Sequence, residues 1–308
     1  EDQIRMIFGC CHPEVPADSR VALTLKIVGG FSVGEIARAY LAKDEAIAKM
    51  LTRAKQKLRT VALEIPAGGA LGERLDSVLR VLYLMFNEGY SASAGSDLVR
   101  RDLCLEAIRL TGLLLAHPAT SDPKVHALAA MLLFQAARLR TRTDASGDLL
   151  LMADQDRNLW DRQMLGKGLE HFLRAAAGNE LSDYHIEAEI ASIHALAPTY
   201  EATEWARILK CYDLLLARNF SPVVALNRVV ALGEVSGPEA ALDDLGDLAA
   251  NYLMTSFNLF HITRGHLLAQ LRRNSEAAEA YRRAGELTKN DAVVRFLERK
   301  IQVLTSTR

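Results

Sequence analysis

Apolar residues recur at spacings of three and four along almost the whole chain, which is the pattern of amphipathic helices. Alternating apolar and polar runs are nearly absent, as are the Asn-Gly and Asp-Gly pairs that mark hairpins. The pattern therefore predicts an all-α fold. One extended run is expected at Leu149–Met152, after a turn at Asp144 and Gly147, and a helix containing Trp160 is expected to follow it.

The segment EIPAGGALGE, residues 64–73, interrupts the helical pattern with one proline and three glycines, which stop helix growth. It predicts a linker between a small N-terminal unit, residues 1–63, and a larger helical remainder. The remainder is divided into a middle block, residues 74–178, and a repetitive C-terminal part, residues 179–308.

Three pairs of amphipathic helices are predicted in the C-terminal part, at a spacing close to the ~34-residue period of tetratricopeptide repeats (TPR). The third pair fits best, with Gly265 and Leu268 in its first helix and Ala277 and Tyr281 in its second. The segment DAVVRFLERKIQVL then predicts a final helix that covers the open end of a stacked array.

A helix-turn-helix is predicted within residues 32–59. Ser32 and Glu35 have the spacing of a capping box, so a first helix begins at Ser32 and ends near a turn at Leu41–Lys43. The second helix places Ile47, Leu51 and Ala54 on one apolar face, which is expected to pack on the first helix and on the preceding RVALTLKIV segment.

The opposite face of the second helix is polar and basic. Arginine, glutamine and lysine are the side chains that contact base edges and phosphates in the major groove of DNA. A solvated basic surface explains the same pattern equally well, so the residues alone leave both interpretations open. The face consists of Lys49, Thr52, Arg53, Gln56 and Lys57.

The distribution of charge indicates which part of the chain would bind nucleic acid. The formal net charge of the whole chain is −1, which gives no global sign of affinity for nucleic acid. Residues 1–63 hold ten Lys/Arg and seven Asp/Glu, and residues 43–59 alone hold six basic and two acidic side chains. The positive charge is therefore concentrated on the second helix.

Longer motifs carry a resemblance to a known family. Residues 17–59, with EIA at 35–37 and TRAKQKLR at 52–59, resemble region 4 of sigma-70 factors. The segments RMIFGCCHP, LYLMFNEGYSASAG, LVRRDLCLEAIRL, DQDRNLWDR and SPVVALNRVVAL are similar to extracytoplasmic-function (ECF) sigma factors with a TPR-like C-terminal extension. This resemblance covers nearly all 308 residues.

The resemblance implies a function and its partners. It implies a sigma factor whose region 4 recognises the promoter −35 element and binds the β-flap and β′ of RNA polymerase, while the extension regulates activity through a protein or peptide on the helical repeats. Contacts to the −35 element would come from Lys49, Thr52 and Arg53, and flanking or phosphate contacts from Lys43, Gln56 and Lys57. Nothing matches region 2, so the resemblance implies an incomplete factor, either truncated, as the start at Glu1 favours, or a divergent regulator that kept only the −35 reader.

Other candidate sites have weaker patterns. Asp154, Asp156, Arg157 and Trp160 combine charge with an aromatic ring beside an irregular loop, and they form a candidate partner surface or pocket. The segment CCHP lacks a second Cys/His pair, so packing in the core is favoured over a metal site. The four cysteines are widely spread and are expected to be reduced and buried.

No phosphate loop, dinucleotide fingerprint or nucleophile elbow is present, so the sequence predicts a protein that is not an enzyme and has no cofactor or metal. No apolar run approaches the ~20 residues of a membrane span, so a cytoplasmic protein without a membrane partner is expected. Two alternatives remain: a LuxR-like helix-turn-helix/TPR regulator that binds operator DNA without acting as a sigma factor, and a TPR-type interaction scaffold.

Overall fold

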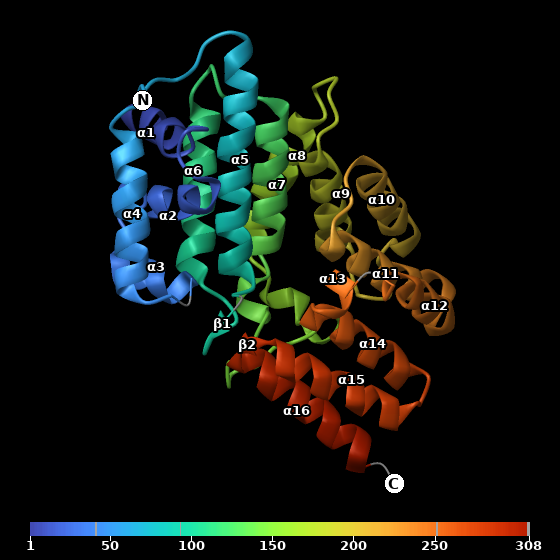
Figure 1. Cartoon of the computed structure of the whole chain (residues 1–308). Helices are drawn as coiled ribbons and strands as arrows, with labels where there is room; N and C mark the ends of the chain where they lie inside the picture. The colour runs from blue at the N-terminus through green and yellow to red at the C-terminus, as the bar shows by residue number, and fades with distance from the viewer. Residues whose placement is uncertain (41, 93, 251, 307–308) are drawn as a thin grey trace. The chain divides into compact units, whose positions relative to one another are not determined.

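The computed structural model describes residues 1–40, 42–92, 94–250 and 252–306, and it confirms the all-α fold (Figure 1). The chain divides into two compact units. Unit 1 consists of residues 1–95, 99–139 and 161–185, and unit 2 consists of residues 96–98, 140–160 and 186–308. The last boundary, between residues 185 and 186, falls inside one helix, α9, which spans Asp183–Leu196.

Unit 1 contains eight long helices among its described residues. They are α1 (Asp2–Cys10), α2 (Ala17–Ile27), α3 (Val33–Tyr40), α4 (Asp44–Leu58), α5 (Gly69–Tyr90), α6 (Arg101–Ala116), α7 (Pro123–Ala136) and α8 (Arg162–Ala175), with the two-residue strand β1 (Ala94–Gly95) after α5.

The helices on both sides of residues 64–73 pack together in unit 1. α1 and α2 contact α5, and the guanidinium of Arg74 at the start of α5 donates a hydrogen bond to the carbonyl of Phe8 in α1 (2.9 Å). Figure 1 shows α4, α2 and α1 on one side of α5 and α6. The N-terminal helices and the middle block therefore share one compact unit.

α7 is the most deeply buried helix of unit 1. Nearly every residue from Val125 to Ala136 is buried, as expected for a helix that is apolar on all sides. α7 packs closely on α8, where Gly168 leaves room for the ring of Phe134, a residue that is 1% exposed. The glycine permits this close approach because a Cβ atom at position 168 would lie 2.9 Å from that ring.

Two glycines of α8 provide a matched test of this contact. We expect Gly168→Ala to lower the free energy of unfolding by about 1–2 kcal/mol, because the added methyl group overpacks the core. Gly166→Ala on the same helix meets no atom within 4 Å and is expected to raise it by about 0.5–1 kcal/mol through helix propensity. Urea denaturation followed by circular dichroism measures both, and equal effects would contradict the close packing of α7 on α8.

Unit 2 is built from consecutive helices that pack on their neighbours. They are α9 from Ile186, α10 (Trp205–Arg218), α11 (Pro222–Ser236), α12 (Pro238–Leu248), α13 (Tyr252–Thr255), α14 (Asn258–Gln270), α15 (Asn274–Leu287) and α16 (Asp291–Ser306), with the two-residue strand β2 (Lys289–Asn290) before α16. The helices predicted for the C-terminal part are all present, and α13 is an additional short one.

Polar contacts join the helices of unit 2 to each other and to the irregular segment 140–160. Arg228 of α11 forms ion pairs with Asp213 of α10 (2.6 Å) and Asp244 of α12 (2.9 Å). Asp148, only 6% exposed, pairs with Arg295 and Arg299 of α16. α16 is therefore fixed to the irregular segment as well as to α15.

The segment 140–160 differs in part from the expectation. Leu149 forms an isolated antiparallel bridge with Thr143, but Met152 begins a 3-10 helix, Met152–Asp154, so the extended run is shorter than predicted. The prediction of a helix containing Trp160 is wrong. Trp160 follows the 3-10 helix Arg157–Leu159, and α8 begins at Arg162 because Asp161 caps it by accepting a hydrogen bond from the backbone N–H of Met164 (3.0 Å).

Candidate nucleic-acid interface

α4 is held in unit 1 by its apolar face. Ile47, Leu51 and Ala54 are almost completely buried, and the helix contacts α2 and α3. Met50 and Leu58 flank this face and are half-buried. The predicted packing of the second helix on the first helix and on the segment before it is therefore confirmed.

The capping box at the start of α3 is also confirmed. The backbone N–H of Glu35 donates to the hydroxyl of Ser32 (3.1 Å), and the backbone N–H of Ser32 donates to the carboxylate of Glu35 (2.7 Å). α3 ends at Tyr40 and α4 begins at Asp44, as the pattern predicts, although Leu41 of the predicted turn lies outside the described residues.

The side of α4 opposite the buried face is exposed and basic. All six predicted DNA-contact residues are exposed: Lys43, Lys49, Thr52, Arg53, Gln56 and Lys57. Five of them, from Lys49 to Lys57, recur at helical spacing, which places them on one face, and Lys43 is the N-cap residue of the helix. We call the five the α4 row.

The described part of the chain provides no carboxylate partner for the charges of the α4 row. Among the residues that the structure describes, Lys49, Arg53 and Lys57 form no ion pair with a carboxylate. The acidic side chains of α4 itself, Asp44 and Glu45, lie in its first turn, where they stabilise the positive end of the helix dipole. The row therefore presents to solvent three cations that have no acidic partner among the described residues.

Thr52 has a defined hydrogen-bonding state. Its hydroxyl donates to the backbone carbonyl of Ala48, one turn earlier (2.7 Å). The hydroxyl oxygen remains free to accept, so Thr52 offers an acceptor and a methyl group between the donors of Lys49 and Arg53. Ala48 itself is exposed and small, which leaves the N-terminal half of this face open to a close ligand.

The second candidate site has a structural explanation for two of its four residues. Arg157 donates to the carbonyl oxygens of His194 (2.8 Å) and Ala197 (2.9 Å), at the end of α9. Its guanidinium also lies 4.5 Å from the ring centre of Trp160, which is 3% exposed and donates to the hydroxyl of Thr141 (3.0 Å). Arg157 and Trp160 thus join the irregular segment to α9.

The carboxylates of this second site differ from each other. Both are exposed, but Asp156 also accepts a hydrogen bond from the backbone N–H of Asn158 (2.9 Å) and caps the 3-10 helix that begins at Arg157. Their assignment as a partner surface or pocket stays a prediction.

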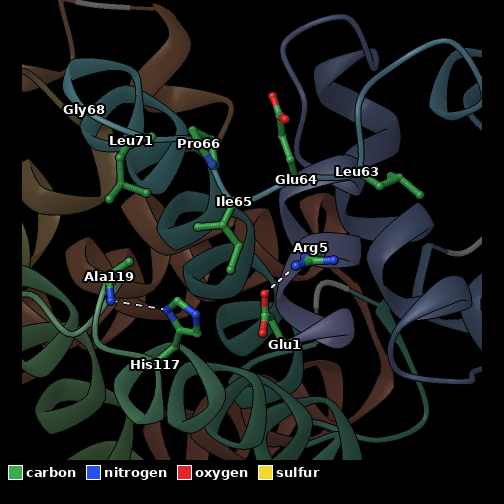
Figure 2. A pocket seen from close by; sticks show the side chains of 11 residues that line it. Glu1, Arg5, Leu63, Glu64, Ile65, Pro66, Gly68, Leu71, His117 and Ala119 are labelled. Carbon is green, nitrogen blue, oxygen red and sulfur yellow. Dashed lines mark hydrogen bonds and ion pairs between the residues drawn. The ribbon is translucent and has the colours of Figure 1, made fainter.

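A recess of about 550 Å³ lies elsewhere in unit 1 (Figure 2). Figure 2 shows Ile65, Pro66 and Leu71 above it, the Glu1–Arg5 ion pair on one side, and His117 on the other. Its walls are the start of α1, the 63–68 connection, the start of α5 and the loop after α6. No residue of the α4 row lines this recess, so it offers no support for the candidate interface.

The cysteines fit the expectation of buried thiols. All four are free and buried, and burial raises the pKa of Cys11 to about 12. Such a thiol stays protonated and unreactive near neutral pH. Within the described ranges, no group of three or more His, Cys, Asp or Glu side chains is arranged to hold a metal ion. None of the helices described has the length and apolar character required to cross a membrane.

The middle block of the chain matches a known protein family. Residues 74–176, which run from α5 through α8, match a family of unknown function (DUF6596). An uncharacterized protein of Rhizobium meliloti (strain 1021) is 40% identical over 312 residues, a match that covers 99% of this chain and 72% of the relative. The chain therefore belongs to the same family as this Rhizobium meliloti protein. No solved structure matches it significantly.

Two contacts were not anticipated from the sequence. One is the hydrogen bonding of Arg157 to the end of α9, and the other is a direct contact between His126 of α7 and His171 of α8. Each joins residues about 40 positions apart or more, and no motif spacing connects them. Only the packing of the helices brings these side chains together.

Proposed function

We propose that this chain acts in transcription initiation as an ECF-type sigma factor, with α3 and α4 as the helix-turn-helix that reads the promoter −35 element. The observation that carries the proposal is the α4 row, an exposed and unneutralised basic face on a helix whose other face is fixed by α2 and α3. The proposed partners are −35 promoter DNA and the β-flap and β′ of core RNA polymerase.

The chemistry of the α4 row suits a major groove. Arg53 and Lys49 supply the donors that pair with the O6 and N7 acceptors of guanine, and Gln56 supplies the paired donor and acceptor that recognise adenine. Lys57, one turn beyond Arg53, and Lys43, at the N-terminal end of α4, are suitably placed for phosphates. Because phosphate contacts release counterions, binding should weaken steeply as the salt concentration rises.

The proposed role of unit 2 is regulatory, through a TPR-like array that binds a protein or peptide. Support comes from the pair α14–α15, where the TPR-like positions pack as such a pair requires. The ring of Tyr281 lies against Gly265, so close that a Cβ atom at position 265 would be 2.6 Å from it. Leu268, Ala277 and Ala280 form one apolar cluster between the two helices.

The proposal predicts different effects on DNA binding for substitutions of three cations of α4. Arg53→Ala is expected to weaken binding to the preferred duplex by roughly 5- to 150-fold, since a base-contacting arginine contributes about 1–3 kcal/mol. Lys55→Ala is the matched control, because Lys55 is half-buried on the same helix and lies outside the α4 row. Lys57→Ala should weaken binding to all sequences about equally and reduce the salt slope by about 1.

The measurement starts from a library of duplexes with a randomised core, selected by the chain with and without core RNA polymerase. Enrichment that needs the polymerase and is lost with Arg53→Ala supports the sigma proposal. Tight enrichment of palindromic duplexes by the chain alone would instead favour a LuxR-like regulator. Absence of enrichment under both conditions, at low salt as well, would favour an interaction scaffold.

A further inference from the structure

The rings of His126 and His171 meet between α7 and α8 of unit 1. Their Nδ1 atoms are 2.9 Å apart and their ring centres 5.1 Å apart, and both side chains are half-buried. The two residues belong to the segment that matches DUF6596. The contact takes no part in the proposed DNA interface, so its chemistry is independent of the proposed function.

The short distance between the two Nδ1 atoms limits how many protons the two rings can bind while they stay hydrogen-bonded to each other. A hydrogen bond between two imidazoles needs one Nδ1 that carries a hydrogen and one that offers a lone pair. A first added proton can bind the outer nitrogen of the donor ring, and it leaves this hydrogen bond in place. A second proton must occupy the acceptor Nδ1, which then places two N–H groups and two positive charges against each other.

The charged groups around the pair do not cancel this repulsion. Burial, followed by the charge of Arg174, lowers the pKa of His126, and Asp122 opposes the shift. Burial, followed by the charge of His126, lowers the pKa of His171. Arg174 and Lys167 act in the same direction on His171, whereas Glu170 opposes them.

Neighbouring helices bring further charged or titratable groups to this part of unit 1, but these groups have partners of their own. Asp76 of α5 pairs with Lys124 of α7 (2.7 Å). His185, at the start of α9, contacts the Ser182 hydroxyl (2.8 Å) and the carbonyl of Ala175 (3.3 Å). In the described part of the chain, no charged group of α6 acts on either histidine. Protonation of the pair is therefore governed by α7 and α8 themselves.

We propose that the His126–His171 contact is a pH-sensitive joint that keeps α7 and α8 together when it holds at most one extra proton and loosens them when both rings are protonated. α7 is the most buried helix of unit 1, so the loosening affects the centre of the DUF6596 segment. The loosening requires only the protonation of the two rings, which lie where α7 packs on α8.

The direction of the pH effect comes from linkage. In the unfolded chain both histidines titrate near 6.5, whereas in the folded chain their pKa values lie lower. Well above pH 6.5 the histidines are neutral in both the folded and the unfolded state, so they make stability independent of pH there. As the pH falls below that value, the unfolded state binds more protons, so stability is lost progressively until the folded pKa values are reached.

The test compares hydrogen–deuterium exchange at pH 7.5 and pH 5.5 in the whole chain, after correction for intrinsic exchange rates. We expect the corrected exchange of α7 and α8 amides to rise severalfold at the lower pH in the wild-type protein. The rise should be largely absent in His126→Asn and in His171→Asn, because the side chain of asparagine does not titrate. His117→Asn is the control, because His117 lies in the loop after α6 and its ring Nδ1 accepts a local hydrogen bond from the backbone N–H of Ala119 (3.3 Å).

A second measurement needs no variant. The ¹⁵N-labelled imidazoles of the wild-type protein should titrate in two separated steps that belong to the pair, as interacting sites do. Independent titration of both rings near 6.5 would overturn the proposal. So would equimolar Zn²⁺ that protects α7 and α8 in the wild type but not in His126→Asn, since the pair would then be a metal site.

Discussion

Trp160→Ala is expected to lower the free energy of unfolding by about 3–5 kcal/mol, the range found when a buried aromatic side chain is removed. The indole is 3% exposed, its N–H is bonded to Thr141, and the guanidinium of Arg157 lies over its ring. The substitution therefore opens a cavity and removes the support of the arginine that holds the end of α9. The largest changes should occur in unit 2.

Leu159→Ala is the matched control for Trp160→Ala, because Leu159 precedes Trp160 in the chain and is 61% exposed. Its expected effect is within about 0.5 kcal/mol. Urea denaturation followed by circular dichroism compares the two variants, and in Trp160→Ala the remaining Trp205 provides a fluorescence signal from unit 2. Equal stability of the two variants would contradict a structural role for Trp160 and would favour its assignment as a partner-binding residue.

Gly89→Ala is expected to lower the free energy of unfolding by about 3 kcal/mol through overpacking at the contact of α5 with α6. A Cβ atom at position 89 would lie 2.8 Å from the carbonyl oxygen of Arg100 and 2.8 Å from the backbone nitrogen of Cys104. These are backbone atoms of the first turn of α6 and its cap, so no side-chain rotation relieves the clash. The carbonyl of Gly89 also accepts a hydrogen bond from the N–H of Arg100 (2.7 Å).

Gly112→Ala separates this packing effect from helix propensity. Gly112 lies in α6, and a Cβ atom there meets nothing within 4 Å. This variant should be more stable than the wild type by about 0.5–1 kcal/mol. Thermal and urea denaturation of both variants measure the difference. A Gly89→Ala variant as stable as Gly112→Ala would show that the backbones of α5 and α6 do not approach each other this closely.

Local sequence patterns predicted the features that depend on neighbouring residues. The capping box of Ser32 and Glu35 was predictable because both partners lie within one helical turn. The buried and exposed faces of α4 were predictable because helical periodicity assigns each residue to one side. The helix containing Trp160 was predicted wrongly, since the apolar spacing there continues across the cap residue Asp161.

Local patterns also predicted which residues form the candidate interface. The periodicity placed the α4 row on one face, and the structure adds that the row has no internal acidic partner among the described residues. The hydrogen bond of Thr52 to Ala48 is local as well, but choosing it over a solvent contact required the helix geometry.

By itself, the sequence determined the all-α class, the presence of the helices of the C-terminal part and the basic face of α4, because periodicity, capping and charge act over a few residues. Only the tertiary structure decided which distant side chains meet. It brought Arg157 to the end of α9 and His126 to His171, and it packed α1 and α2 against α5. The physical reason is that these contacts depend on how whole helices pack, and close packing of side chains selects one arrangement that no local spacing encodes.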